Sequence, residues 1–149
     1  MFRLRTTTLL ILAVATLGCN SGETPLIPGR SRTVPVQGTI TLDGAPIEGA
    51  TVMFFCKKLM VTSYGKTDSA GQYQLTTYEP GDGAPVGHYL VSVKKTKQTI
   101  VQPSDHPAEP PKTQTAELLP PQYSDYESSQ LKAVVAEGNA NAFQFDLSP

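Results

Sequence analysis

Residues 34–55 read VPVQGTITLDGAPIEGATVMFF, and this stretch decides the fold class. From Val34 to Leu42 apolar or small residues alternate with polar ones, which is the period of a strand with one buried face. The run stops at residues 43–46 (DGAP), a tight-turn signal. From Thr51 to Cys56 both faces are apolar, as in a central strand. The stretch therefore predicts two strands joined by a turn.

The same alternation recurs along the rest of the chain, and we expect seven short strands. They are residues 34–42, 51–56, 64–67, 72–77, 88–95, 131–136 and 143–147. Gly and Pro number 12 and 13 among 149 residues, which is typical of a turn-rich β protein. No segment carries a convincing helical period. The sequence therefore predicts an all-β fold, a seven-stranded antiparallel Greek-key β-sandwich.

One segment, residues 96–129, breaks the regular spacing of strands and contains six prolines. We expect a Pro-rich mobile insertion near 98–121, with its mobile part running from Gln98 to Glu117. A docked segment should follow it, because four side chains there offer apolar surface to bury. They are Leu118, Leu119, Tyr123 and Tyr126.

The N-terminus is typical of an export signal. Arg3 and Arg5 supply a positive start, and Leu9 to Leu17 supply a short apolar run. That run is about half of the roughly 20 residues needed to span a bilayer. Residues 1–18 are therefore predicted to be a signal peptide.

Cys19 follows Gly18 at the end of the apolar run, which resembles a bacterial lipobox. In that motif the cysteine is acylated and becomes the new N-terminus, usually after an aliphatic and a small residue; Thr16 and Leu17 depart from this pattern. The resemblance implies export, lipidation of Cys19 and anchoring to a bacterial cell-envelope membrane. Residues 19–33 then form a lipidated N-terminus and flexible tether. The alternative is an ordinary secretory signal that leaves Cys19 as a thiol.

The charge balance favours neither nucleic acid nor an anionic lipid surface as a partner. The formal charge is −1, and removal of Arg3 and Arg5 with the signal would leave ten basic against 13 acidic side chains. An acidic domain gains little attraction from a polyanion. Membrane attachment must therefore come from acyl chains, each buried methylene contributing about 0.8 kcal/mol.

Residues 65–77 read GKTDSAGQYQLTT, and together with residues 34–55 they resemble the carboxypeptidase regulatory-like domain. The matching elements are the Asp-Gly-x-Pro-Ile turn, the Gly49-Ala50 strand opening and the Thr67-Asp68-x-x-Gly71 turn before Tyr73. The resemblance covers residues 34–148 and implies a transthyretin-like β-sandwich over residues 34–149. Such domains recur in bacterial envelope proteins, and residues 118–147 look like the tail of short stand-alone lipoproteins. The residues of these motifs stabilise turns, and they do not by themselves indicate a catalytic activity.

We expect no catalytic, cofactor-binding or metal-binding residue. His88 and His106 are eighteen residues apart with no Cys or His near either, whereas zinc sites favour clustered ligands. Two enzymes that share a transthyretin-like fold, intradiol dioxygenases and hydroxyisourate hydrolases, need His-x-His or several His, which are absent here. Asp82, Asp105 and Asp125 lack calcium-loop spacing and are expected to be solvated carboxylates.

Cys56 has no partner if Cys19 is acylated. It ends an apolar run, so we expect a small buried hydrophobe. The alternative is a reactive or intermolecular thiol.

The predicted role is that of a non-catalytic envelope module that binds a partner or packs structurally, with protein contact favoured. Binding through loops Glu79–Gly87 and Thr96–Pro121 at one end of the sandwich is expected, because loops on a rigid scaffold commonly carry recognition. The alternatives are a polysaccharide-binding module and an enzyme with an unrecognised site. Sugar platforms commonly use exposed Trp, and the chain has none.

The lipobox resemblance generates the first testable prediction. Cys19→Ser should abolish acylation and leave a soluble or unprocessed form, whereas the wild-type protein should partition into detergent with mass added at Cys19. Phase partitioning and mass spectrometry of the mature N-terminus measure both. An unmodified mature protein that begins at another residue would contradict the prediction.

Overall fold

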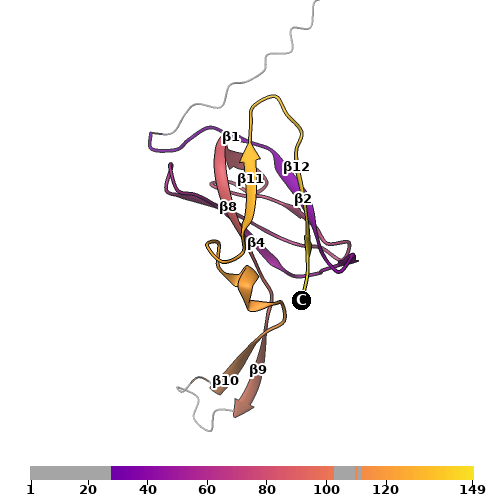
Figure 1. The fold of residues 1–149 in the computed structure, drawn as a ribbon. Coiled ribbons are helices and arrows are strands. Elements are labelled where there is room, and N and C mark those ends of the chain that lie inside the picture. Colours follow the sequence, from indigo (N-terminus) through magenta and orange to yellow (C-terminus); the bar gives the residue numbers. More distant parts are fainter. Residues whose placement is uncertain (1–27, 103–109, 111) are drawn as a thin grey trace, which may run out of the picture.

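The strands of the domain form two main sheets that face each other (Figure 1). The computed structural model describes residues 28–102, 110 and 112–149. Over these residues the chain consists of strands with one short 3-10 helix, η1 (Pro121–Ser124), which confirms the prediction of an all-β protein. In this part of the chain no helix is long and apolar enough to cross a membrane.

The first sheet is antiparallel throughout. Its order is β11 (Leu131–Val135), β8 (Gly87–Lys94), β4 (Thr51–Cys56) and β5 (Val61–Lys66). β4 pairs with β8 on one side and with β5 on the other, which confirms the central strand predicted from its apolar run. Alternate residues of β4 are fully buried, and the others are half-buried.

The second sheet is built around β2 (Val36–Leu42), which pairs with three strands. β12 (Asn141–Leu147) runs parallel to β2 along its whole length. On the other side, β6 (Gln72–Gln74) and β3 (Ala45–Pro46) pair with β2 antiparallel. The prediction of a purely antiparallel fold is therefore wrong. Side chains alternate in the same way in either strand direction, so the pattern that located β12 could not give its direction.

Each of the seven predicted segments holds a strand, but the described residues hold twelve strands in all. A short ladder joins β1 (Thr33–Val34) to β7 (Ala84–Pro85). A separate hairpin pairs β9 (Thr96–Gln102) with β10 (Lys112–Glu117). The irregular structure expected from Gln98 to Glu117 is therefore wrong for these two strands; its mobility stays a prediction. Their described side chains are all exposed, so no buried face marked them in the sequence.

The segment after the hairpin docks through two of its four apolar residues. Leu119 and Tyr123 join the core, and the Tyr123 hydroxyl accepts a hydrogen bond from the Ser148 amide at 3.1 Å. Leu118 is exposed. Tyr126 is 36% exposed, and its ring packs on Phe55 with 4.9 Å between centroids. The docking prediction is thus confirmed for Leu119 and Tyr123 only.

The predicted turns are confirmed, and each rests on the residue type that signalled it. Asp43 and Gly44 have φ of 50° and 76°, the left-handed region that a tight hairpin turn requires. A carboxylate oxygen of Asp68 accepts hydrogen bonds from the Ala70 and Gln72 amides, both at 2.9 Å. Asp68 therefore organises the backbone of its own turn.

Two contacts between the sheets fix their relative position. Tyr64 of β5 exchanges both backbone hydrogen bonds with Thr76, at 2.8 and 2.9 Å, which closes the sandwich beside β6. Between β11 and β12 the Asn141 amide accepts from the Ala136 N–H and donates to the Ala136 carbonyl, each at 3.0 Å.

Phe54 of β4 is fully buried where the two sheets meet. Its ring centroid lies 5.7–6.2 Å from four other aromatic rings in tilted or edge-on arrangements, which are favourable for aromatic pairs. Three of these rings belong to the second sheet and one to the first; they are Tyr73, Phe143, Phe145 and Tyr89. Phe54 therefore joins the two sheets.

This cluster generates a stability prediction. Phe54→Ala should lower the free energy of unfolding by about 3–5 kcal/mol, because it leaves a cavity between two sheets that cannot close on each other. Val134→Ala, on the exposed side of β11, should change it by less than about 0.5 kcal/mol. Urea unfolding followed by circular dichroism measures both. Equal effects of the two substitutions would contradict the assigned core.

Candidate functional site

The chemistry-bearing residues singled out from the sequence do not converge on one site. Cys19 and His106 lie outside the described residues, and so does Asp105. His88 is exposed on β8. Within the described ranges, no group of three or more His, Cys, Asp or Glu side chains could hold a metal ion. The expectation of no catalytic, cofactor or metal site stays a prediction.

Cys56 is 1% exposed at the end of β4. The backbone of Gly87 covers its sulfur so closely that a Cβ added at Gly87 would lie 3.2 Å from Sγ. Among the residues that the structure describes it has no cysteine partner. The prediction that Cys56 is a small buried hydrophobe is therefore confirmed.

Two buried phenols also serve the fold. Tyr89 donates a hydrogen bond to the Pro85 carbonyl at 2.7 Å, and Tyr73 donates to the Phe143 carbonyl at 3.2 Å. Burial raises the pKa of both hydroxyls well above the ordinary value of tyrosine. They therefore stay protonated donors to backbone acceptors rather than proton acceptors for a reaction.

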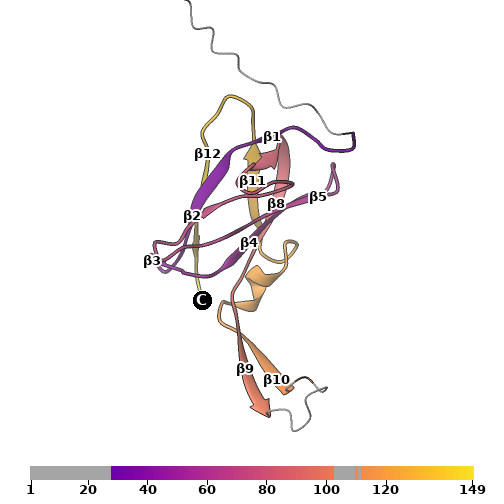
Figure 2. The ribbon, with the colours of Figure 1, turned by 180° about the vertical axis from the view of Figure 1, so that it is seen from behind.

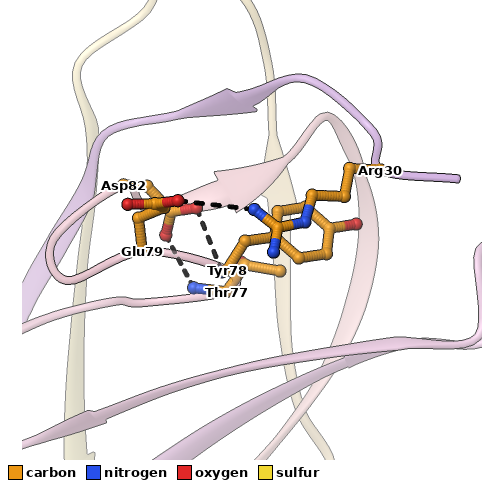
Figure 3. Close-up of polar contacts among 5 residues, drawn as sticks. All are labelled: Arg30, Thr77, Tyr78, Glu79 and Asp82. Carbon is orange, nitrogen blue, oxygen red and sulfur yellow. Dashed lines mark hydrogen bonds and ion pairs between the residues drawn. The ribbon is translucent and has the colours of Figure 1, made fainter. Parts of the chain in front are cut away.

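The loop that follows β6 is held in one shape by Asp82 (Figure 3). Its two carboxylate oxygens accept hydrogen bonds from the Thr77 amide at 2.7 Å and the Tyr78 amide at 3.1 Å. The Thr77 hydroxyl in turn donates to the Gly83 carbonyl at 2.6 Å. The prediction of a solvated carboxylate is therefore wrong for Asp82, which organises this loop.

The segment before β1 packs against the same loop (Figure 3). The Arg30 guanidinium lies 5.1 Å from the centre of the Tyr78 ring and 3.4 Å from a carboxylate oxygen of Glu79. The Ser31 amide donates to the Tyr78 hydroxyl at 3.2 Å. We call Arg30, Ser31, Tyr78 and Glu79 the N-terminal clamp. Part of the predicted tether thus contacts the domain, and this end of the sandwich is occupied by the chain itself.

The two loops expected to act together lie at opposite ends of the domain (Figures 1 and 2). β8 connects them: it begins after β7 beside the N-terminal clamp and ends where β9 leaves the body. The expectation that Glu79–Gly87 and Thr96–Pro121 share one end is therefore wrong. A strand of eight residues separates them, a length of about 26 Å.

The β9–β10 hairpin projects from the body at the end away from β1 (Figures 1 and 2). All its described side chains are exposed, including Ile100 at 60% and Val101 at 57%. A two-stranded ribbon that buries neither face is only marginally stable in water. This hairpin is therefore the part of the described chain best suited to gain stability from a partner.

A shallow polar cavity of about 600 Å³ lies on the outer face of the second sheet. Strand pairing explains its lining: one row holds Ala142, Gln37 and Gln74, and the next holds Gln144, Thr39 and Gln72. Other residues that line the cavity are Gly38, Lys66, Asp68, Tyr73, Thr76 and Gly81. The sequence had shown these Gln and Thr residues only as polar faces of separate strands.

Comparison with known proteins adds no functional assignment. No family model matches the chain, and no curated protein does. A solved structure of a 9R-lipoxygenase from Cyanothece PCC8801 aligns with 79% of this chain and 16% of that chain, at 13% identity and a TM-score of 0.37. This chain thus spans about a sixth of that protein, and a likeness at this level carries no argument.

The environment of Cys56 generates a reactivity prediction. In a Cys19→Ser background, Cys56 should react with a thiol reagent at least about a hundredfold more slowly in the native protein than in denaturant, because reaction requires the strand to open. Mass spectrometry over time measures the rate. The same background carrying Val86→Cys should add one fast-reacting thiol, since Val86 is exposed. Fast native labelling of Cys56 would contradict its burial.

Proposed function

We propose that this protein is an exported bacterial lipoprotein whose β domain is a non-catalytic binding module. In this proposal Cys19 carries the acyl chains, and the domain contacts an envelope protein through the β9–β10 hairpin. The observation that carries it is the placement of two elements: the described chain begins beside β1, and the hairpin projects from the opposite end (Figures 1 and 2). Anchoring at one end leaves the other free to reach a partner.

The N-terminal clamp supports this orientation. Because Arg30 and Ser31 contact the domain, only residues 20–29 remain between Cys19 and the clamp. If these ten residues form the flexible tether that the sequence predicts, their average reach is about 17 Å. An acylated Cys19 would therefore keep the clamp end close to the membrane and the hairpin away from it.

The chemistry of the hairpin favours a protein as its partner. Ile100 and Val101 offer apolar surface, and both ribbon edges present backbone N–H and C=O groups. An extended segment of another protein can add to such an edge, so that main-chain hydrogen bonds give affinity and side chains give specificity. The hairpin lysines Lys97 and Lys112 help to prevent indiscriminate edge pairing.

The fold itself we propose to be the transthyretin-like Greek-key sandwich of the carboxypeptidase regulatory-like domain. The two facing sheets and the turns at Asp43 and Asp68 support this. Fold alone carries no function, because one sandwich scaffold serves many partners. A polysaccharide is the second candidate ligand, favoured by the polar cavity on the second sheet.

Replacement of the hairpin tests the proposed contact. A variant with residues 97–116 replaced by a short Gly-Ser turn should keep its melting temperature within a few degrees, because the described hairpin residues contribute nothing to the core. In native membranes the wild-type protein should form a crosslink to an envelope protein, and this crosslink should be absent for the variant. Crosslinking followed by mass spectrometry compares the two.

A matched pair of surface variants serves as the control. Ile100→Ser with Val101→Ser should weaken the same crosslink, whereas Val134→Ser, equally exposed but on β11, should leave it intact. If the hairpin variant folds and keeps the crosslink, the hairpin is not the contact surface.

A further inference from the structure

The outer face of the second sheet presents four glutamine amides and two threonine hydroxyls in a regular array. We call this the amide face; it consists of Gln37, Thr39, Gln72, Gln74, Gln144 and Thr76. It joins three strands that lie far apart in the chain, β12, β2 and β6, and Thr76 lies two residues after the end of β6. It is therefore a product of the fold rather than of a local motif.

The array continues past β6 onto β5. Thr76 pairs with Tyr64, and the Asp68 amide donates to the Gln72 carbonyl at 2.8 Å. Lys66, at the end of β5, and Asp68 line the same cavity. The amide face is thus bordered by Lys66 and Asp68, whose opposite charges balance.

The amides of this face are free to bind a ligand. Within the described residues, no hydrogen bond joins the side chains of Gln37, Gln72, Gln74 or Gln144 to another protein group. Each carboxamide offers two donors and one acceptor. Neighbouring sugar hydroxyls present the complementary alternation of acceptor and donor, so one amide can engage two hydroxyls.

Tyr64 supplies an apolar surface at the rim. It is 54% exposed, and its backbone pairs with Thr76, which lines the cavity. An exposed phenol ring can pack against the C–H face of a pyranose while its hydroxyl stays in water. The cavity volume of about 600 Å³ falls within the range of ligand sites.

We propose that the amide face binds a neutral polysaccharide. The glutamine amides hydrogen-bond to its hydroxyls, and Tyr64 packs on one sugar ring. Balanced charge favours a neutral chain over a phosphorylated or sulfated one. The buried core of a protein interface is usually richer in apolar and aromatic side chains than this face of Gln and Thr residues. The site is separate from the hairpin, so the protein could hold a cell-envelope glycan and a protein partner at once.

The test is a ligand-observed NMR titration of the full-length protein in detergent with three neutral hexasaccharides, namely cellohexaose, laminarihexaose and the hexamer of N-acetylglucosamine. At least one should bind. Gln72→Ala with Gln74→Ala should weaken that binding about tenfold or more, through the loss of two amides. The matched control, Gln98→Ala with Gln114→Ala, removes two exposed strand glutamines from the hairpin and should leave binding unchanged.

Three results would overturn the inference: no binding of any of the three sugars, equal losses in the two double variants, or tighter binding of a sulfated hexasaccharide that weakens with salt. The hairpin-replaced variant separates this inference from the proposed protein contact. It should bind the sugar as the wild-type protein does, even if the envelope crosslink is lost.

Discussion

The burial of Phe54 between two sheets is the interaction on which the rest of the structure depends. Its ring contacts Tyr89 of its own sheet and three aromatic rings of the second sheet. Phe143 of β12 and Ile40 of β2 belong to this core or pack against it, and the alternation of side chains along each strand turns Gln144 and Gln37 outward. The core and the amide face thus both follow from the two-residue alternation of side chains along these strands.

The sequence predicted the features that depend on neighbouring residues, such as strand alternation and turns. It did not predict the features that depend on which strands pair across long distances in the chain. The alternation from Val36 to Leu42 and the Asp68 turn could be read directly, since each depends on neighbours in the chain. The parallel direction of β12 could not, because it depends on which strand lies beside it. The β9–β10 hairpin was missed because Ile100 and Val101 bury nothing.

The candidate surfaces were harder to foresee than the fold. Asp82 looked like a solvated loop carboxylate, yet it accepts hydrogen bonds from two consecutive amides and shapes the loop that receives Arg30. That contact gives the domain a defined N-terminal end, and β8 carries the chain from there to the hairpin. A recognition surface built from both loops would have required them to lie at the same end, whereas the structure places the N-terminal clamp and the hairpin at opposite ends.

The most direct test of this proposal measures how far the hairpin and the clamp end of the domain lie from a membrane. In vesicles containing the acylated protein, a fluorophore on Gln114→Cys in the hairpin should lie farther from lipid-bound acceptors than one on Val86→Cys near β1, and energy transfer reports the difference. Cys56 is buried and should not take the label. Lower transfer from position 114 is the predicted result. Equal transfer, or higher transfer from position 114, would contradict a domain held at its clamp end.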